Sequence, residues 1–286
     1  MGYQHRVFTE QVKANFEAEG RGIAEGKDWK PWYQLGDLSA HFRDDNRFTC
    51  LYTQREVYLS TFLARLCWNA LELEDDTVEI LECAPLDRTT TQRIAKTLGI
   101  PHPKDPDSLV DLVMTTSLIA KKQRDGKTFR TPIHCCTRAA LEKFSNIEEI
   151  QIQAAYWRLH GQELRVFTGC ELSIHPQWRS NIDTLGTYRL PSPDPDGELG
   201  RFANQCERVL EMLLQSKTDF ALDRWAHDAA PRLQMTTPEV IGRLLHLVCR
   251  LRVRLDMAAG PVMRQTTAAA LSLTQPSRAE PALRTA

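Results

Sequence analysis

The chain has 286 residues, of which 42% are apolar and 26% are charged, and these proportions exclude a disordered chain and indicate a folded globular protein. Its formal net charge of -1 gives no overall attraction to nucleic acid, so any DNA contact has to come from a local basic surface. No stretch reaches the ~18 to 20 apolar residues of a membrane helix, the start lacks the apolar core of a signal peptide, and the 8 cysteines include no CxxC pair; we therefore expect a cytoplasmic protein with reduced thiols.

Apolar periodicity predicts helices and strands that alternate through the first half. In chain order they are a helix over residues 8–19, a strand over 48–52, a helix over 55–73, a strand over 77–83, a helix over 89–98, strands over 109–118 and 132–136, a helix over 139–160 and a strand over 164–168. Gly99 is expected to end one helix, and Arg124-Asp125-Gly126-Lys127 predicts a turn between two strands. This order favours an α/β core, a mixed sheet with flanking helices.

The second half differs in character from the first. Three prolines in residues 191–197 predict a linker. Helices are expected over residues 198–214 and 219–228, the second capped by Asp219, and a third begins at Thr237-Pro238-Glu239. After Leu247 the apolar period becomes two, which predicts a hairpin. Three helices followed by a hairpin is the order of an α+β winged-helix-like domain.

These patterns divide the chain into four parts. They are an N-terminal α/β domain over residues 1–173, a linker over 174–197, a winged-helix-like C-terminal domain over 198–270 and a disordered tail over 271–286.

Eight short landmarks stand in order in the first half. They are Glu19-Gly20-Arg21-Gly22 with Gly26-Lys27-Asp28 and Pro31-Trp32; Thr53-x-Arg55; Glu82-x-x-Pro85-Leu86; Gly99-Ile100-x-His102-Pro103; Met114-x-Thr116; Ala139-Ala140-Leu141; Tyr156-Trp157; and Val166-Phe167-Thr168. Over residues 8–173 their order and spacing resemble TnsA-type endonuclease subunits of heteromeric cut-and-paste transposases. The resemblance implies a restriction-endonuclease-like core that cuts one strand at each transposon end and a winged-helix second domain. It also implies three partners: transposon-end DNA, a DDE-type transposase subunit and an AAA+ ATPase regulator.

The same resemblance locates the metal site of the nuclease. The family places a Glu on the first long helix, an Asp at the start of a strand, Gln-x-Lys on the next strand and another Glu on the following helix. Carried over, these positions fall at Ala64, at Ser117, at His134-Cys135-Cys136, with Cys136 in the place of the lysine, and at Gln153. Mg²⁺ prefers carboxylate oxygen, so these residues cannot hold it. We expect no intact catalytic residue, no metal and no cofactor.

Three alternatives are open. Glu56, Glu72 and Asp111 are candidates for a relocated Mg²⁺ site in an active endonuclease that cuts the 5′ strands, although each is more commonly a solvated residue. The segment His134-Cys135-Cys136 has two interpretations, a zinc or redox site and a strand with small core thiols. Strand alternation puts adjacent cysteines on opposite faces, so the pair cannot chelate one ion together. A restriction-type nuclease outside transposition would need the same carboxylates, which are missing here. The remaining alternative is a stand-alone DNA-binding or defence protein.

Two groups of basic residues are candidates for DNA binding. In the first half they are Arg21, Lys27 and Lys30, beside Trp29 and Trp32. In the second half they are Arg243, Arg250, Arg252 and Arg254, the last three at period two on one face of the expected hairpin. Solvated faces and, for the tryptophans, core packing are the competing interpretations.

Taken together, the sequence favours a TnsA-like transposase subunit that binds DNA ends and assembles with its partners but has lost its own cutting activity. If such a subunit replaces the active one, the 5′ strands stay uncut and transposition ends in a cointegrate.

Overall fold

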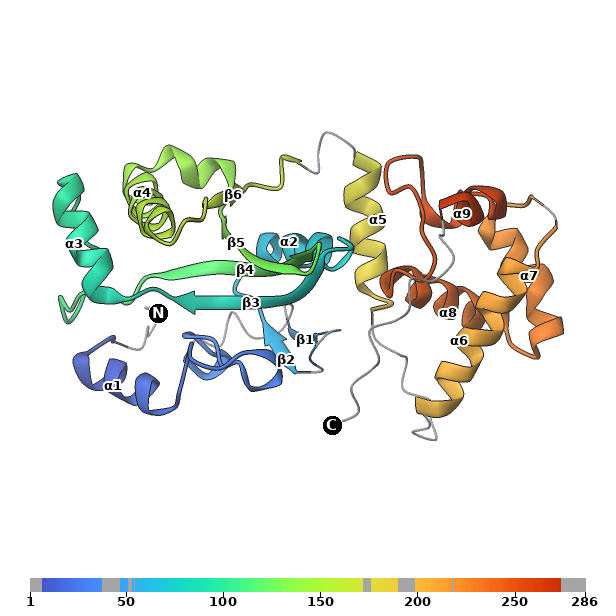
Figure 1. Cartoon of the computed structure of the whole chain (residues 1–286), viewed down its shortest axis with the longest axis horizontal. Coiled ribbons are helices and arrows are strands. Elements are labelled where there is room, and N and C mark those ends of the chain that lie inside the picture. The colour runs from blue at the N-terminus through green and yellow to red at the C-terminus, as the bar shows by residue number, and fades with distance from the viewer. Residues whose placement is uncertain are drawn as a thin grey trace, which may run out of the picture. The chain divides into compact units, whose positions relative to one another are not determined.

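The computed structural model describes residues 7–37, 47–50, 53, 55–171, 176–189, 199–217 and 219–273 (Figure 1). The chain divides into two compact units, Met1–Glu171 and Leu172–Ala286. None of the described helices combines the length and the apolar character that a membrane crossing needs. Residues 51–52 of the expected first strand, the proline-rich segment 191–197 and the tail from residue 274 lie outside the described residues.

The first unit contains two sheets and four α-helices within the described residues. Its helices are α1 (Glu10–Ala18), α2 (Phe62–Glu72), α3 (Arg88–Leu98) and α4 (Phe144–Leu159), with 3₁₀ turns η1 (Gly26–Asp28), η2 (Leu35–Asp37) and η4 (Arg138–Glu142). Its strands are β1 (Arg47–Thr49), β2 (Glu56–Tyr58), β3 (Thr77–Pro85), β4 (Thr115–Arg124), β5 (Lys127–Cys135) and β6 (Arg165–Phe167).

The central sheet is mixed, as the sequence predicted, with the strand order β3-β4-β5-β6. The first two pairings are antiparallel, and β5 pairs with β6 in parallel. The expected turn at Asp125 and Gly126 is confirmed, because both residues have positive φ and connect β4 directly to β5. Gly99 likewise adopts the left-handed conformation that ends α3.

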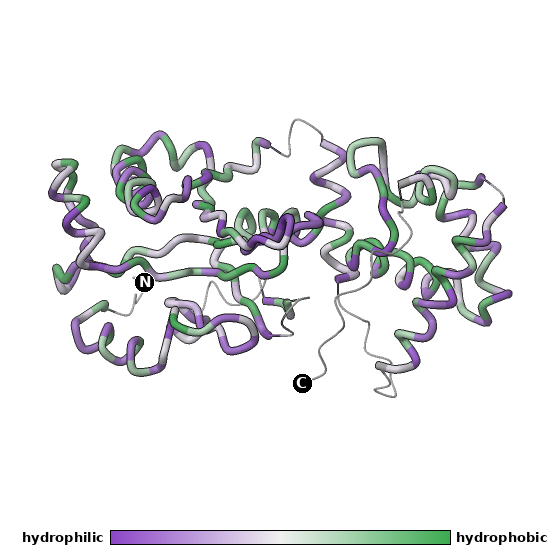
Figure 2. The backbone as a smooth tube through the Cα atoms, in the orientation of Figure 1, coloured by the Kyte–Doolittle hydropathy of each residue, from purple (hydrophilic) through white to green (hydrophobic). Residues whose placement is uncertain are grey.

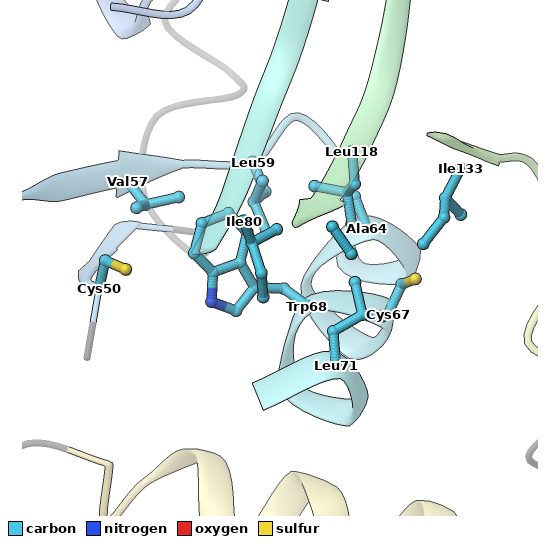
Figure 3. Close-up of a cluster of buried hydrophobic side chains, with 11 residues drawn as sticks. Cys50, Val57, Leu59, Ala64, Cys67, Trp68, Leu71, Ile80, Leu118 and Ile133 are labelled. Carbon is cyan, nitrogen blue, oxygen red and sulfur yellow. The ribbon is translucent and has the colours of Figure 1, made fainter. Parts of the chain in front are cut away.

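Helices cover both faces of this sheet. Trp68 and Leu71 of α2 pack on Ile80, Leu118 and other side chains of one face (Figure 3). Leu81 and Ile119, which alternate with those residues along the strands, face a second cluster that includes residues of α3 and α4. A period of two therefore divides each strand between two cores, which explains why β3 and β4 are apolar on both sides.

Four predicted boundaries were wrong. The strand expected over residues 132–136 begins five residues earlier, at Lys127. The helix expected over residues 55–73 begins only at Phe62, because the Thr61 hydroxyl accepts the Ala64 N–H, and residues 56–58 form strand β2 instead. The strand expected over 109–118 begins at Thr115 and runs six residues further, to Arg124. The helix expected over 139–160 is divided into η4 and α4 at Lys143, which has extended backbone angles.

The N-terminal segment is fastened to the unit by Asp105, a carboxylate that is 1% exposed. Its oxygens accept the backbone N–H groups of Phe8 at 2.9 Å, Asp107 at 3.0 Å and Ser108 at 2.9 Å. These hydrogen bonds, chiefly those from Ser108 and Phe8, hold the pKa of Asp105 below its usual value. The segment before α1 is thus joined to a loop almost a hundred positions away.

Asp105→Asn should therefore destabilise the protein in a pH-dependent way. Hydrogen bonds to a charged acceptor contribute about 1.5–3 kcal/mol, so we expect a loss of about 2 kcal/mol at pH 7. Because the pKa of Asp105 is lower in the folded protein, its carboxylate stabilises the folded protein at pH values above the unfolded pKa of about 3.9. This contribution is lost as the pH falls through the folded pKa. The difference between wild type and variant in urea unfolding should shrink below about pH 4. Asp107→Asn, at an exposed neighbour, is the control, and a pH-independent difference would contradict this role.

Apart from an isolated bridge between Ala221 and Thr266, the regular secondary structure in the described residues of the second unit is helical. Its helices are α5 (Pro176–Gly186), α6 (Leu199–Leu214), α7 (Leu222–Leu233), α8 (Thr237–Cys249) and α9 (Thr267–Leu273), with a 3₁₀ turn η6 (Val262–Arg264). Helix α8 contacts α5, α6 and α7. The trace of α6 and α7 alternates between hydrophilic and hydrophobic stretches, as expected of helices with one buried face (Figure 2). Helix α5 lies inside the segment that was expected to be a linker.

Helix starts in this unit differ slightly from the predictions. The cap of α8 is Thr236 rather than Thr237, in a capping box with Glu239. Asp219 does not cap α7, which starts after Ala221; its carboxylate accepts the N–H of Ala268 in α9.

The predicted hairpin after the third helix is wrong: residues 250–261, all described, contain no strand. Leu251 has a φ of 57° and ends α8, with its N–H bonded to Val248 and that of Arg252 to Leu247. The buried Asn181 side chain of α5 then donates to the carbonyls of Met257 and Gly260. The alternating apolar residues are buried, but in a loop held by side chains, so the described residues do not show the order expected of a winged helix.

Candidate functional site

A cavity of about 160 Å³ lies where α2 begins and where β3, β4 and β5 meet it. We call it the neutral pocket. Its lining residues come from the N-terminal arm (residues 7–37), from the segment that leads into α2, from α2 itself and from the sheet. They are Tyr33, Tyr58, Leu59, Ser60, Thr61, Ala64, Cys83, Thr115, Ser117 and Cys135. None of the ten is Asp, Glu, Lys, Arg or His.

Two irregularities in the sheet turn side chains into this pocket. Cys83 has a φ of 44°, which interrupts the regular alternation of β3. On β4, the buried Thr116 accepts a hydrogen bond from Trp157 of α4 at 2.9 Å, whereas the next residue, Ser117, lines the pocket on the α2 side. The Ser117 hydroxyl accepts the backbone N–H of Cys135 at 3.0 Å, which joins β4 to the end of β5.

Two of the four positions carried over from the family, Ala64 and Ser117, line the neutral pocket. The third does so only with a shift of one residue: Cys135 lines the pocket, whereas Cys136 lies beyond the end of β5 and donates its N–H to Phe167. Gln153 lies elsewhere, buried on α4 beside the Ile152 side chain that packs on the opposite face of the sheet. It lies close to His134, and burial lowers the pKa of that histidine.

The neutral pocket carries no side-chain charge that could attract a cation. Burial, aided by the nearby Cys83, raises the pKa of Tyr33 to about 12. Burial, aided by the carboxylate of Glu82, raises the pKa of Cys83 to about 12 as well. Both groups therefore stay protonated at neutral pH.

Magnesium does not fit this donor set. Mg²⁺ is held by carboxylates in near-octahedral geometry, and the pocket offers hydroxyl and thiol groups instead. Across the part of the chain that the structure describes, no group of three or more His, Cys, Asp or Glu side chains is arranged to hold a metal ion.

The three acids considered for a relocated site lie away from the pocket and have other partners. Glu56 is on β2 and pairs with Arg47 at the surface. Glu72 is buried and accepts the indole N–H of Trp68 at 2.7 Å. Asp111 accepts a hydrogen bond from Gln92 at 2.6 Å.

A buried ion pair next to the pocket was not predicted. Arg55 contacts both oxygens of Glu82, with Nη1–Oε1 at 2.6 Å and Nη2–Oε2 at 2.5 Å. Nη2 also donates to the carbonyl of Ile80 at 3.0 Å. Burial raises the pKa of Glu82, and the charge and hydrogen bonds of Arg55 oppose this. Both residues belong to the sequence landmarks named above. The landmarks singled them out, but they did not indicate that the two side chains form an ion pair.

The basic candidates of the first unit separate into two kinds. Arg21 is 6% exposed, its guanidinium contacts Asp37 and Glu19, and it lies over the ring of Phe16, so its charge is used inside the unit. Lys27 and Lys30 are exposed, and Lys30 donates to the carbonyl of Glu19. The neighbouring tryptophans, Trp29 and Trp32, are both buried in the core.

The candidates of the second unit are not aligned on one strand face. Arg243 bonds Gln205 and lies over the ring of Phe202. Arg252 pairs with Glu207 of α6. Arg250 and Arg254 belong to the loop after α8, and both also have interactions within the protein.

The four-stranded mixed sheet, the helices on both faces and the pocket at the strand ends define a mixed α/β protein consistent with a nuclease-type core. No family model matches the chain. Over 199 residues, however, it is 30% identical to the Transposon Tn7 transposition protein TnsA of Escherichia coli, and the match covers 70% of each protein. The chain therefore belongs to the TnsA family of transposition proteins.

Proposed function

We propose that this chain is a subunit of a heteromeric transposase that binds transposon ends and assembles with its partners without cutting DNA itself. The observation that supports this most directly is the neutral pocket, which is lined by Ala64 and Ser117, two of the positions carried over from the family, and by Cys135. Phosphodiester hydrolysis of this kind depends on a cation that neutralises charge at the phosphate and activates a water. An uncharged pocket supplies neither a ligand for that cation nor a lysine.

On this proposal the partners are transposon-end DNA, a DDE-type transposase subunit and an AAA+ ATPase. Among the DNA-binding candidates of the first unit, Lys27 and Lys30 have exposed side chains that can reach a phosphate backbone. The second unit offers a groove of about 330 Å³ between α6 and α7, lined in part by Met212, Phe220 and Trp225. A groove that combines apolar side chains with charged ones, among them Lys217, Asp228 and Arg232, suits a protein partner, and we assign the contact with the ATPase to this unit.

Reconstitution with the DDE subunit, the ATPase and end DNA tests the proposal. We expect a complex on native gels that contains this chain, and no 5′-strand nicks with Mg²⁺ or Mn²⁺. A family member that carries the carboxylates provides the positive control for nicking. Nicks at the 5′ strands that disappear with EDTA would contradict the loss of activity, and failure to join the complex would favour a stand-alone DNA-binding or defence protein.

The product of transposition gives a second measurement in the same system. If this chain is the only TnsA-like subunit, the 5′ strands remain joined to the donor, and the element should form cointegrates rather than simple insertions. Sequencing of the junctions distinguishes the two outcomes.

A further inference from the structure

Two cysteine side chains meet at the wall of the neutral pocket. Cys67 lies on the face of α2 that packs on the sheet and is 3% exposed. Figure 3 shows its sulfur on the side of the helix toward Ile133 of β5. Cys135, two positions along β5, packs against the same cluster and also lines the pocket. One thiol is therefore sealed in the core, and its neighbour borders a cavity.

We propose that Cys67 and Cys135 form a reversible disulfide bond when the protein meets a peroxide, fixing α2 to the end of β5. This inference rests on the packing of the two thiols and holds whether or not the chain cuts DNA. The two side chains share a hydrogen bond, which together with burial raises the pKa of Cys67 far above its usual value. Cys67 therefore stays a thiol, and the oxidant reacts at Cys135.

The chemistry takes two balanced steps. The sulfur of Cys135 attacks a peroxide oxygen, the O–O bond breaks, and hydrogen peroxide yields a sulfenic acid at Cys135 and one water. The Cys67 sulfur then attacks that sulfenic sulfur, the S–O bond breaks, and the departing oxygen takes the Cys67 proton to leave as a second water. Two thiols are oxidised and one peroxide is reduced. A dithiol reductant reverses the bond.

Other pairings are less favourable on this geometry. Cys83 also borders the pocket, but it interacts with Cys135 through charge alone, whereas Cys67 shares a hydrogen bond with Cys135. Cys136 follows Cys135 directly in the chain, and neighbouring Cα atoms lie closer together than an unstrained disulfide allows.

Peptide mapping of the full-length protein tests the inference without any substitution. After treatment with hydrogen peroxide, digestion under non-reducing conditions should yield one linked peptide pair containing Cys67 and Cys135, lighter by two hydrogen atoms and absent after dithiothreitol. The oxidised protein should also unfold several degrees higher, because the bond restrains the unfolded chain. Linkage of Cys135 to Cys83 or Cys136, or no linkage in a protein that keeps its native circular dichroism, would overturn the proposal.

Variants separate the roles of the two thiols. In Cys67→Ala, the linked pair should be lost and a sulfenic acid at Cys135 should be trapped by a 1,3-diketone probe. In Cys135→Ser, both the linked pair and the trapped acid should be absent. Cys206→Ser, at a buried cysteine of α6 in the other unit, should behave like the wild type.

Discussion

Arg55→Ala is expected to lower the free energy of unfolding by about 3–5 kcal/mol, because it leaves the Glu82 carboxylate buried without its counter-charge. The two side chains are 7% and 1% exposed, so water cannot replace the guanidinium. Equilibrium urea unfolding followed by tryptophan fluorescence measures the loss.

The pair at the protein surface supplies a matched control. Arg47 contacts Glu56 with side chains that are 53% and 60% exposed, and Arg47→Ala should cost no more than about 1 kcal/mol. If Arg55→Ala and Arg47→Ala lose the same free energy of unfolding, burial does not make the Arg55–Glu82 pair more important for stability than the surface pair.

The effect of Arg55→Ala should also depend on pH. Burial raises the folded pKa of Glu82, and a raised carboxyl pKa means that the folded protein gains stability relative to the unfolded chain as the pH falls. Loss of Arg55 raises that pKa further, so protonation relieves the buried charge. The deficit of the variant should therefore shrink between neutral and mildly acidic pH. The double variant Arg55→Met/Glu82→Leu should be more stable than Arg55→Ala, since it removes both charges.

Gly22→Ala should destabilise the protein more than the same change at Gly20. Both glycines have left-handed backbone angles, with φ of 74° and 72°, so both substitutions incur about 1–2 kcal/mol of backbone strain. A Cβ at Gly22 would lie 2.1 Å from Cγ of Pro85, whereas a Cβ at Gly20 meets nothing within 4 Å.

A proline ring cannot rotate away, so the arm or the end of β3 has to move. We expect Gly22→Ala to cost about 2 kcal/mol more than Gly20→Ala in the same urea unfolding experiment, the scale of overpacking in a tight contact. Equal losses at the two positions would show that the close approach of the arm to Pro85 is not needed. This contact matters for the site because the arm also brings Tyr33 to the neutral pocket.

Local patterns were sufficient where one short-range preference dominated. The Asp125-Gly126 turn, the left-handed Gly99 and the helix 199–214 all depend on residues close in sequence, and all were predicted. The strand over residues 56–58 was not predicted, since the helix expected from the apolar period of Leu59 and later residues was taken to include them. Their pairing with Arg47–Thr49 decides in favour of a strand.

The positions carried over from the family lie together only in part, for a similar reason. Ala64 and Ser117, which the order of landmarks had singled out, line one pocket. Uniform strand alternation could not decide whether Cys135 or Cys136 lines it with them. The left-handed Cys83 and the hydrogen bond from Cys135 to Ser117 make that choice. Gln153 lies apart from the pocket because it belongs to α4, whose rotation about its axis is set by packing on α3 and the sheet.

By itself the sequence determined the family, the mixed sheet and the uncharged residues at the positions carried over from the family, since these depend on residue identity and local period. Only the tertiary structure decided which thiol borders the pocket, that Arg55 neutralises Glu82 and that the arginines after α8 lie in a loop. Each of these depends on contacts between residues far apart in the chain. Side-chain burial and long-range hydrogen bonds, such as those of Asn181 with residues 257–262, override the local alternation there.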